Sequence, residues 1–247
     1  MMMIIPNWNA PSNVKAFAST RVDGFSQAQY QGLNLGSHVG DDINLVQKNR
    51  DWLQQQSKMP SAPVWLNQTH STDVVSVFEP TSEILDADGS FTTQQGVVLS
   101  AMTADCLPVL LTDSKGTQVA AVHAGWRGLA GGIVENAVAK FTNIDDSNPL
   151  LAWLGPAIGR DAFEVGQDVL DAFVGFDPEA AQAFRAKPNI EQKWLANMSQ
   201  LATQRLAHVG VTQVFDCNLC TFADSDNFYS YRRDGVTGRQ ATFIWLD

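Results

Sequence analysis

Two apolar runs joined by a short turn constrain the fold more than any other feature of the sequence. Residues 107–112 read LPVLLT and residues 117–122 read TQVAAV, and Asp-Ser-Lys-Gly separates them. Continuous apolar runs of this length are typical of strands that are buried on both faces. A short turn between two such runs predicts a hairpin. The sequence therefore places an antiparallel strand pair at the centre of the core.

The second strand of this pair leads directly into His123. Several glycines follow, and then an apolar stretch over 129–141 that predicts a helix. Because glycine permits tight turns and close approach of the backbone, this segment predicts a histidine held at a strand-to-helix turn. Two other segments have a similar design. In one, His70 lies between two strand-like runs, and in the other, Cys106 directly precedes the apolar run over 107–112.

His70, Cys106 and His123 are candidate ligands of one metal ion. Zinc prefers imidazole and thiolate ligands, and a catalytic zinc keeps three protein ligands beside an open position. The spacing of these residues matches no compact motif, so two alternatives stay open. A buried cysteine is often a small apolar core residue. A Cys106 nucleophile with His123 as its base would instead make the chain a cysteine hydrolase.

Cys217 and Cys220 form a CxxC pair that competes with this site. A structural zinc would need a second pair of ligands, and a redox pair is expected at a helix start in a thioredoxin-like context. Here the pair lies between a late strand and a polar loop. This placement favours chance spacing, with Cys220 as a candidate pocket-lining residue.

Strands and helices are expected along the whole chain without strict alternation. The expected strands are 14–19, 64–66, 73–78, 97–101, 107–112, 117–122, 150–154, 211–215 and 241–245. The expected helices are 43–56 (capped by Asp42), 129–141 and most of 161–208, with an amphipathic helix over 192–209. This pattern predicts an α+β fold. Because no linker or repeat interrupts it, we expect a single domain over residues 1–247.

Composition excludes several classes of function. A net charge of −10 and a pI of about 4.7 argue against a nucleic-acid partner. No apolar run is long enough to predict a membrane helix, and the first residues, MMMIIPNWNAP, lack the basic region of a signal peptide. Three cysteines without such a signal indicate a reducing compartment. We therefore expect a cytoplasmic protein with neither a membrane nor a nucleic-acid partner.

Seven stretches, taken together, resemble one known family. They are STRVDGFS (19–26), GLNLGSHVGDD (32–42), NQTHSTDV (67–74), TADCLPVLLTD (103–113), VAAVHAGWRG (119–128), LGPAIGRDAFEVG (154–166) and CTFADSDNFYSYRRDGVTGRQATFIWL (220–246). In these stretches the chain is similar to the YfiH/YlmD type of purine nucleoside phosphorylase, also described as laccase-domain or multicopper polyphenol oxidase proteins. HAGWRG together with TADC is the most specific part. Asp23 departs from the glycine that many members carry there.

The resemblance implies a fold, a cofactor and an activity. It implies central mixed β-sheets packed together with helices outside, and it makes His70, Cys106 and His123 the zinc ligands. It also implies phosphate-dependent cleavage of adenosine, inosine and S-methyl-5'-thioadenosine, and deamination of adenosine. The small-molecule partners would then be purine nucleosides and phosphate. A second branch of the family is linked to editing of peptidoglycan precursors by hydrolysis, which is the main alternative.

Further site residues are expected within the matched motifs. Arginine suits phosphate because its fork binds two oxygens at once. We expect Arg127 to be catalytic, and Arg21 and Arg232 to bind substrate with Asn34 shaping the site. Asp105 adjoins the cysteine ligand and is a candidate acid–base group or outer-shell partner. For each of these residues, an ordinary surface position is the competing interpretation.

The oxidase and deaminase interpretations can be compared with the residues present. Multicopper oxidation needs several copper sites with imidazole ligands, whereas the chain has four histidines. One copper ion replacing zinc at the His/Cys/His site is still compatible with the sequence. The common zinc-deaminase signature, H-x-E with P-C-x-x-C, is absent. Deaminase activity would therefore need a different scaffold.

Overall fold

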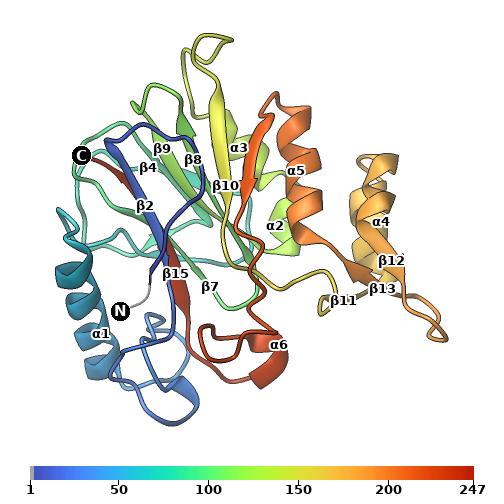
Figure 1. Ribbon diagram of the computed structural model, residues 1–247, viewed down its shortest axis with the longest axis horizontal. Coiled ribbons are helices and arrows are strands. Elements are labelled where there is room, and N and C mark those ends of the chain that lie inside the picture. Colours follow the sequence, from blue (N-terminus) through green and yellow to red (C-terminus); the bar gives the residue numbers. More distant parts are fainter. Residues whose placement is uncertain (1–2) are drawn as a thin grey trace.

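Two β-sheets packed face to face form the centre of the molecule in the computed structural model, which describes residues 3–247 (Figure 1). A six-stranded mixed sheet has the order β14-β10-β8-β9-β6-β4, and a four-stranded antiparallel sheet has the order β1-β2-β15-β7. Their strands are β1 Met3–Ile4, β2 Val14–Ser19, β4 Val74–Ser76, β6 Gly89–Thr92, β7 Leu99–Thr103, β8 Leu107–Asp113, β9 Val119–Ala124, β10 Leu150–Leu154, β14 Gln213–Asp216 and β15 Gln240–Leu246.

The predicted central hairpin is confirmed. Strands β8 and β9 are antiparallel neighbours in the middle of the six-stranded sheet, and every residue of both strands is buried. Their register pairs Pro108 with His123. Because side chains alternate between the two faces of a sheet, each strand contributes side chains to the apolar core on both faces of the six-stranded sheet. This explains the continuous apolar sequence.

Helices cover both outer faces, giving a helix–sheet–sheet–helix stack (Figure 1). Helix α1 (Ile43–Ser57) covers the four-stranded sheet, while α2 (Trp126–Gly131), α3 (Ile133–Val138) and α5 (Met198–His208) cover the six-stranded sheet. The core between the sheets includes Val14, Leu99, Leu110, Ala121, Trp153 and Ile244. The α+β architecture with central sheets and outer helices is therefore confirmed, as is the Asp42 cap, whose side chain accepts from the Asn44 amide.

The expected helix over 129–141 is wrong in its extent. The helical segment begins earlier, at Trp126, and Gly132 divides it into α2 and α3 with a left-handed φ of 103°. Glycine adopts this conformation without the steric cost that other residues carry. The short strand β6 was not predicted, because its sequence GSFT lacks a clear apolar alternation.

The expectation of a mainly helical region over 161–208 is also wrong in part. This region holds β11 (Glu164–Gly166), α4 (Gln167–Val174), the 3-10 helix η2 (Pro178–Ala183), β12 (Phe184–Ala186) and β13 (Lys193–Ala196) before α5 begins. The three strands form a small separate sheet, set to one side of the stack in Figure 1. Trp194 and Leu195 were assigned to a helix but belong to β13, since Asn197 caps α5 only after them.

The segment that carries His70 follows β3 (Leu66–Asn67), which forms a separate two-stranded sheet with β5 (Leu85–Asp86). Short helix α6 (Tyr231–Asp234) lies at one end of the central sheets (Figure 1). Along residues 3–247, none of the helices has the length and apolar character needed to span a bilayer.

Candidate metal centre

The structure brings His70, Cys106 and His123 together. One ligand atom from each lies within 4.8 Å of the others. The His70 Nε2 atom is 3.6 Å from the Cys106 Sγ atom. Cys106 directly precedes β8 and His123 lies near the end of β9, so the register of the central hairpin sets these two side by side. The loop after β3 supplies His70 from outside the sheet.

A buried carboxylate that sequence reasoning missed organises this cluster. The Asp88 Oδ1 atom is 2.7 Å from His123 Nδ1 and also accepts from the His70 amide at 3.0 Å. The second oxygen accepts from the amides of Thr69 and Ser71. One side chain therefore orients the ring of one histidine and the backbone of the other. With Nδ1 bonded to Asp88, His123 presents Nε2 to the cluster, which is the arrangement of a carboxylate–histidine–metal site.

The charges in the cluster depend on one another. Burial alone would raise the pKa of the Cys106 thiol, but His123 and hydrogen bonds from His123 and His70 lower it to about 6. Burial likewise opposes the charged form of His123, yet the Cys106 thiolate and Asp88 raise its pKa to about 9. The pKa of Asp88 is held well below its usual range despite burial, because His123 and Ser71 contact its charged form. Cys106 is thus poised as a thiolate, the form that binds metals.

Backbone geometry around the donors is unusual. His70 has a φ of 63° and Asp105, the residue before Cys106, has a φ of 103°. Such left-handed conformations are costly for residues other than glycine and persist where surrounding contacts enforce them. Here the enforcing contacts are the hydrogen bonds from the His70 amide and to the Asp105 side chain. The strain coincides with two of the three candidate ligand segments.

Gly125 provides the space that His70 occupies. A Cβ atom at this position would lie 2.4 Å from His70 Cδ2 and 3.3 Å from Cys106 Sγ. We expect Gly125→Ala to displace the His70 ring and to weaken zinc affinity by about tenfold or more, since misplacing one ligand has a cost like that of losing its outer-shell support. A competition titration with a chromophoric chelator measures this. Gly175→Ala is the control, because Gly175 is exposed, has an ordinary φ of −64° and lies outside the cluster. Equal affinity in both variants would contradict the steric argument.

The three donors line a cavity of about 250 Å³. Its other lining residues are His38, Gln68, Met102, Thr103, Ala104, Tyr231 and Arg239. Gln68 fixes the adjacent end of β7 by bonding the backbone N and O of Met102. Sequence reasoning did not single out His38 or Arg239 as site residues, although both lie in matched motifs. Their motif membership was the only available signal.

Asp105 points away from the cavity and holds the neighbouring segment. Its carboxylate accepts from Thr221 Oγ1 at 2.7 Å, from Ser230 Oγ at 3.0 Å and from the Arg232 amide at 2.7 Å. It is buried and is not among the cavity-lining residues of the described chain. The carboxylate thereby ties the start of α6 to the segment that carries Cys106.

The arginines named from the motifs lie elsewhere. Arg21 donates to the carbonyls of Ser225 and Gln31, and Arg232 donates to that of Glu164. Arg127 is exposed, with its guanidinium carbon 4.3 Å from the centre of a Trp126 ring. Within the described part of the chain, none of these three lines the cavity.

Asn34 contacts the cavity wall indirectly. It is fully buried, and its Oδ1 atom accepts from the Arg239 amide at 2.8 Å and from the Gly36 amide at 3.0 Å. Its Nδ2 atom donates to Asp41. Asn34 therefore shapes the site by holding Arg239, not by facing the cavity itself.

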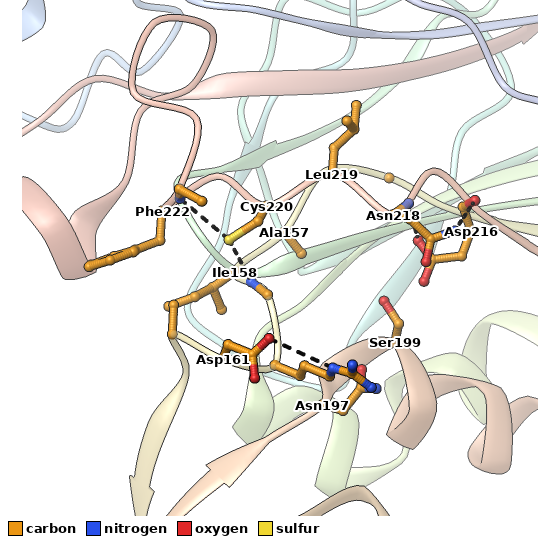
Figure 2. Close-up of a pocket in the computed structure, with 15 residues that line it drawn as sticks. Ala157, Ile158, Asp161, Asn197, Ser199, Asp216, Asn218, Leu219, Cys220 and Phe222 are labelled. Carbon is orange, nitrogen blue, oxygen red and sulfur yellow. Dashed lines mark hydrogen bonds and ion pairs between the residues drawn. The ribbon is translucent and has the colours of Figure 1, made fainter.

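Cys220 lines a different, larger cavity of about 630 Å³. Figure 2 shows its side chain at one side of this cavity, with Asp161 and Asn197 on the opposite side. Its sulfur accepts from the amides of Gly159 and Ala223.

Burial, with Asp216 nearby, raises the pKa of the Cys217 thiol to about 12. So high a pKa leaves little thiolate at neutral pH, which speaks against the redox interpretation of the pair.

The donor set fits zinc with an open position. Two imidazoles and one thiolate are a known catalytic set. Among residues 3–247, no fourth His, Cys, Asp or Glu joins the cluster, and the donors face the cavity. A closed structural site would need such a fourth ligand. The three described donors are therefore the number that a metal site with an open position uses.

Comparison with known proteins places the chain in a family. A family model described as multi-copper polyphenol oxidoreductase laccase matches residues 15–247. The chain is 48% identical over 244 residues to purine nucleoside phosphorylase YfiH of Escherichia coli, covering 99% of this chain and 98% of that protein. A purine nucleoside phosphorylase of Haemophilus influenzae is 46% identical over 247 residues, which is 100% of both chains.

Solved structures share the fold. A crystal structure of a Neisseria meningitidis protein matches with a TM-score of 0.92 and 47% identity, covering 99% of each chain. The crystal structure of YlmD from Geobacillus stearothermophilus matches with a TM-score of 0.88 and 27% identity, covering 98% of this chain and 99% of that one. These likenesses, with the match over residues 15–247, show that the chain belongs to the multi-copper polyphenol oxidoreductase laccase family.

Proposed function

We propose that this chain is a zinc-dependent purine nucleoside phosphorylase acting on adenosine, inosine and S-methyl-5'-thioadenosine, with adenosine deaminase activity as a second reaction. The observation that carries the proposal is the His70–Cys106–His123 cluster, open to one cavity. The names of the Escherichia coli and Haemophilus influenzae relatives support the reaction class. The same cluster would accept copper in place of zinc, since copper competes well for such ligands.

The residues of the chain have distinct tasks in this proposal. His70, Cys106 and His123 hold the metal. Asp88 accepts the Nδ1 proton of His123, which leaves Nε2 as the nitrogen that would bind the metal after its own proton is released. Zinc held by these residues would supply Lewis-acid chemistry to the site. Asp105 positions the Cys106 segment and the start of α6.

Phosphorolysis sets further demands on the cavity. The N-glycosidic bond breaks, a bond forms between ribose C1' and a phosphate oxygen, and the departing purine takes the electron pair. The site must therefore hold an anion beside the sugar and relieve charge on the base. Arg127 as a catalytic group, and Arg21 and Arg232 as substrate contacts, stay part of the proposal through their motifs. Their observed positions would require substrate to extend beyond the cavity.

Product analysis tests the proposal. Zinc-loaded protein is incubated with adenosine, with and without phosphate, and adenine, inosine and hypoxanthine are separated by chromatography. Adenine that forms only with phosphate supports phosphorolysis, and inosine formed without phosphate supports deamination. If no nucleoside is converted, the proposed function is wrong. Release of serine from a peptidoglycan precursor nucleotide would then establish the editing hydrolase.

A further inference from the structure

Arg239 has a special position in the cavity that holds the metal-ligand candidates. It is the only lysine or arginine among the cavity-lining residues of the described chain. Several contacts fix it. Its amide donates to Asn34 Oδ1 at 2.8 Å. Its side chain packs against Gly36, where an added Cβ would lie 2.8 Å from Arg239 Cγ. Arg239 is thus held in place by the GLNLGSH motif.

The hydrogen bonds of this guanidinium leave one edge unused. Nη1 donates to the carbonyls of Thr237 and Gly238, at 3.1 Å and 3.0 Å. Within residues 3–247, Nε and Nη2 have no hydrogen-bond partner and no carboxylate forms an ion pair with the group. The residue is half-buried. Leaving the Nε and Nη2 donors of a partly buried guanidinium without an acceptor is costly, so this arrangement suits a site in which an anion supplies the missing acceptors.

We propose that Arg239 binds the phosphate co-substrate through its unpaired guanidinium edge. The inference rests on the proposed function, because it assigns one of the two substrates of that reaction to a residue. The Nε and Nη2 donors of arginine match two oxygens of a phosphate in a bidentate fork. Nη1 is held by carbonyls, which orients the fork before phosphate arrives and so reduces the ordering cost of binding.

An electrostatic role toward the metal cluster is the competing explanation. Arg239 is close enough to Cys106 for their charges to interact. If this were its main role, replacing Arg239 would change zinc affinity and leave phosphate binding unaltered. The two explanations therefore differ in which ligand responds.

Calorimetric titration with inorganic phosphate, without nucleoside, separates them. The proteins are zinc-loaded wild type, Arg239→Gln, Arg239→Lys and the control Arg185→Gln. Arg185 is an exposed arginine paired with Asp161 and does not line this cavity. Zinc content, unfolding temperature and the KM values for phosphate and for inosine are measured on the same samples.

We expect the Kd and the KM for phosphate to rise about tenfold or more in Arg239→Gln, since a bidentate charged contact is lost. The rise should be smaller in Arg239→Lys, which keeps the charge without the fork, and absent in Arg185→Gln. Zinc content and the KM for inosine should stay near the wild-type values. Should Arg239→Gln fail to fold, the weaker phosphate binding of Arg239→Lys still decides the question.

The inference is overturned if wild-type protein binds no phosphate, or if phosphate binding is equal in wild type and both Arg239 variants. If that equal phosphate binding comes with a loss of zinc, the electrostatic role is supported instead. If phosphate binding depends on Arg239 but no nucleoside is cleaved, the phosphate site stands and the proposed reaction falls.

Discussion

Replacing His123 with alanine should abolish stoichiometric zinc binding and reduce phosphorolysis by about 1000-fold or more. The variant removes the one ligand that is both buried in the central sheet and oriented by Asp88. Lewis-acid stabilisation contributes several kcal/mol to a reaction of this kind, and each 1.4 kcal/mol corresponds to about a tenfold change in rate. Metal analysis by mass spectrometry and an adenine-release assay measure the two losses on the same protein.

His208→Ala is the matched control for this variant. His208 is an exposed histidine on α5 that bonds Asp177 and lies outside the cluster. It should retain zinc and activity. If His123→Ala kept full zinc content, the assignment of the ligand set would be wrong. If it lost zinc but kept its rate, the metal would have no part in the reaction.

Replacing Asp88 with asparagine should weaken both metal binding and folding. The carboxylate contacts the His123 ring and three consecutive backbone amides, from Thr69 to Ser71, and it is fully buried. An asparagine keeps the shape but loses the charge and one acceptor. We expect zinc affinity to fall on the order of 10- to 100-fold. Unfolding in urea should show a loss of about 2–4 kcal/mol in metal-free protein.

Asp113→Asn separates these two effects. Asp113 is also fully buried and accepts from the amides of Thr117 and Gln118, at the far end of the central hairpin. This variant should lose a comparable amount of stability and keep wild-type zinc affinity. A fall in zinc affinity of the same size in both variants would show that general destabilisation, and not the contact with His123, explains the result.

The central strands could be predicted because their continuous apolar sequences match their complete burial in the structure. The strands over 14–19 and 150–154 were expected with the observed bounds, and the hairpin that contains His123 was expected in outline. The region from 161 to 208 was misassigned for a physical reason. Short strands in a small three-stranded sheet depend on partners that are distant in sequence, whereas the apolar spacing around Trp194 also suits a helix.

The candidate site was predictable only in part. The donor types and their place at strand edges indicated His70, Cys106 and His123, and the structure gathers all three. Asp88 gave no signal, because a single aspartate before a short polar strand resembles any turn residue. Arg239 was overlooked among several arginines of the same motif. Which of them reaches the cavity depends on tertiary contacts, such as the hydrogen bond from its amide to Asn34.

The position of β15 has a consequence for how the protein is made. This strand comes last along the chain but lies between β2 and β7, and Arg239 immediately precedes it. A nascent chain that has already emerged through β9 carries all three metal donors but neither a complete four-stranded sheet nor the Arg239 wall of the cavity. The donors are therefore synthesised before the pocket that contains them. Pairing between segments that are distant in sequence is also slow, which lengthens this interval. The site can therefore become active only after β15 has been synthesised and has paired with β2 and β7.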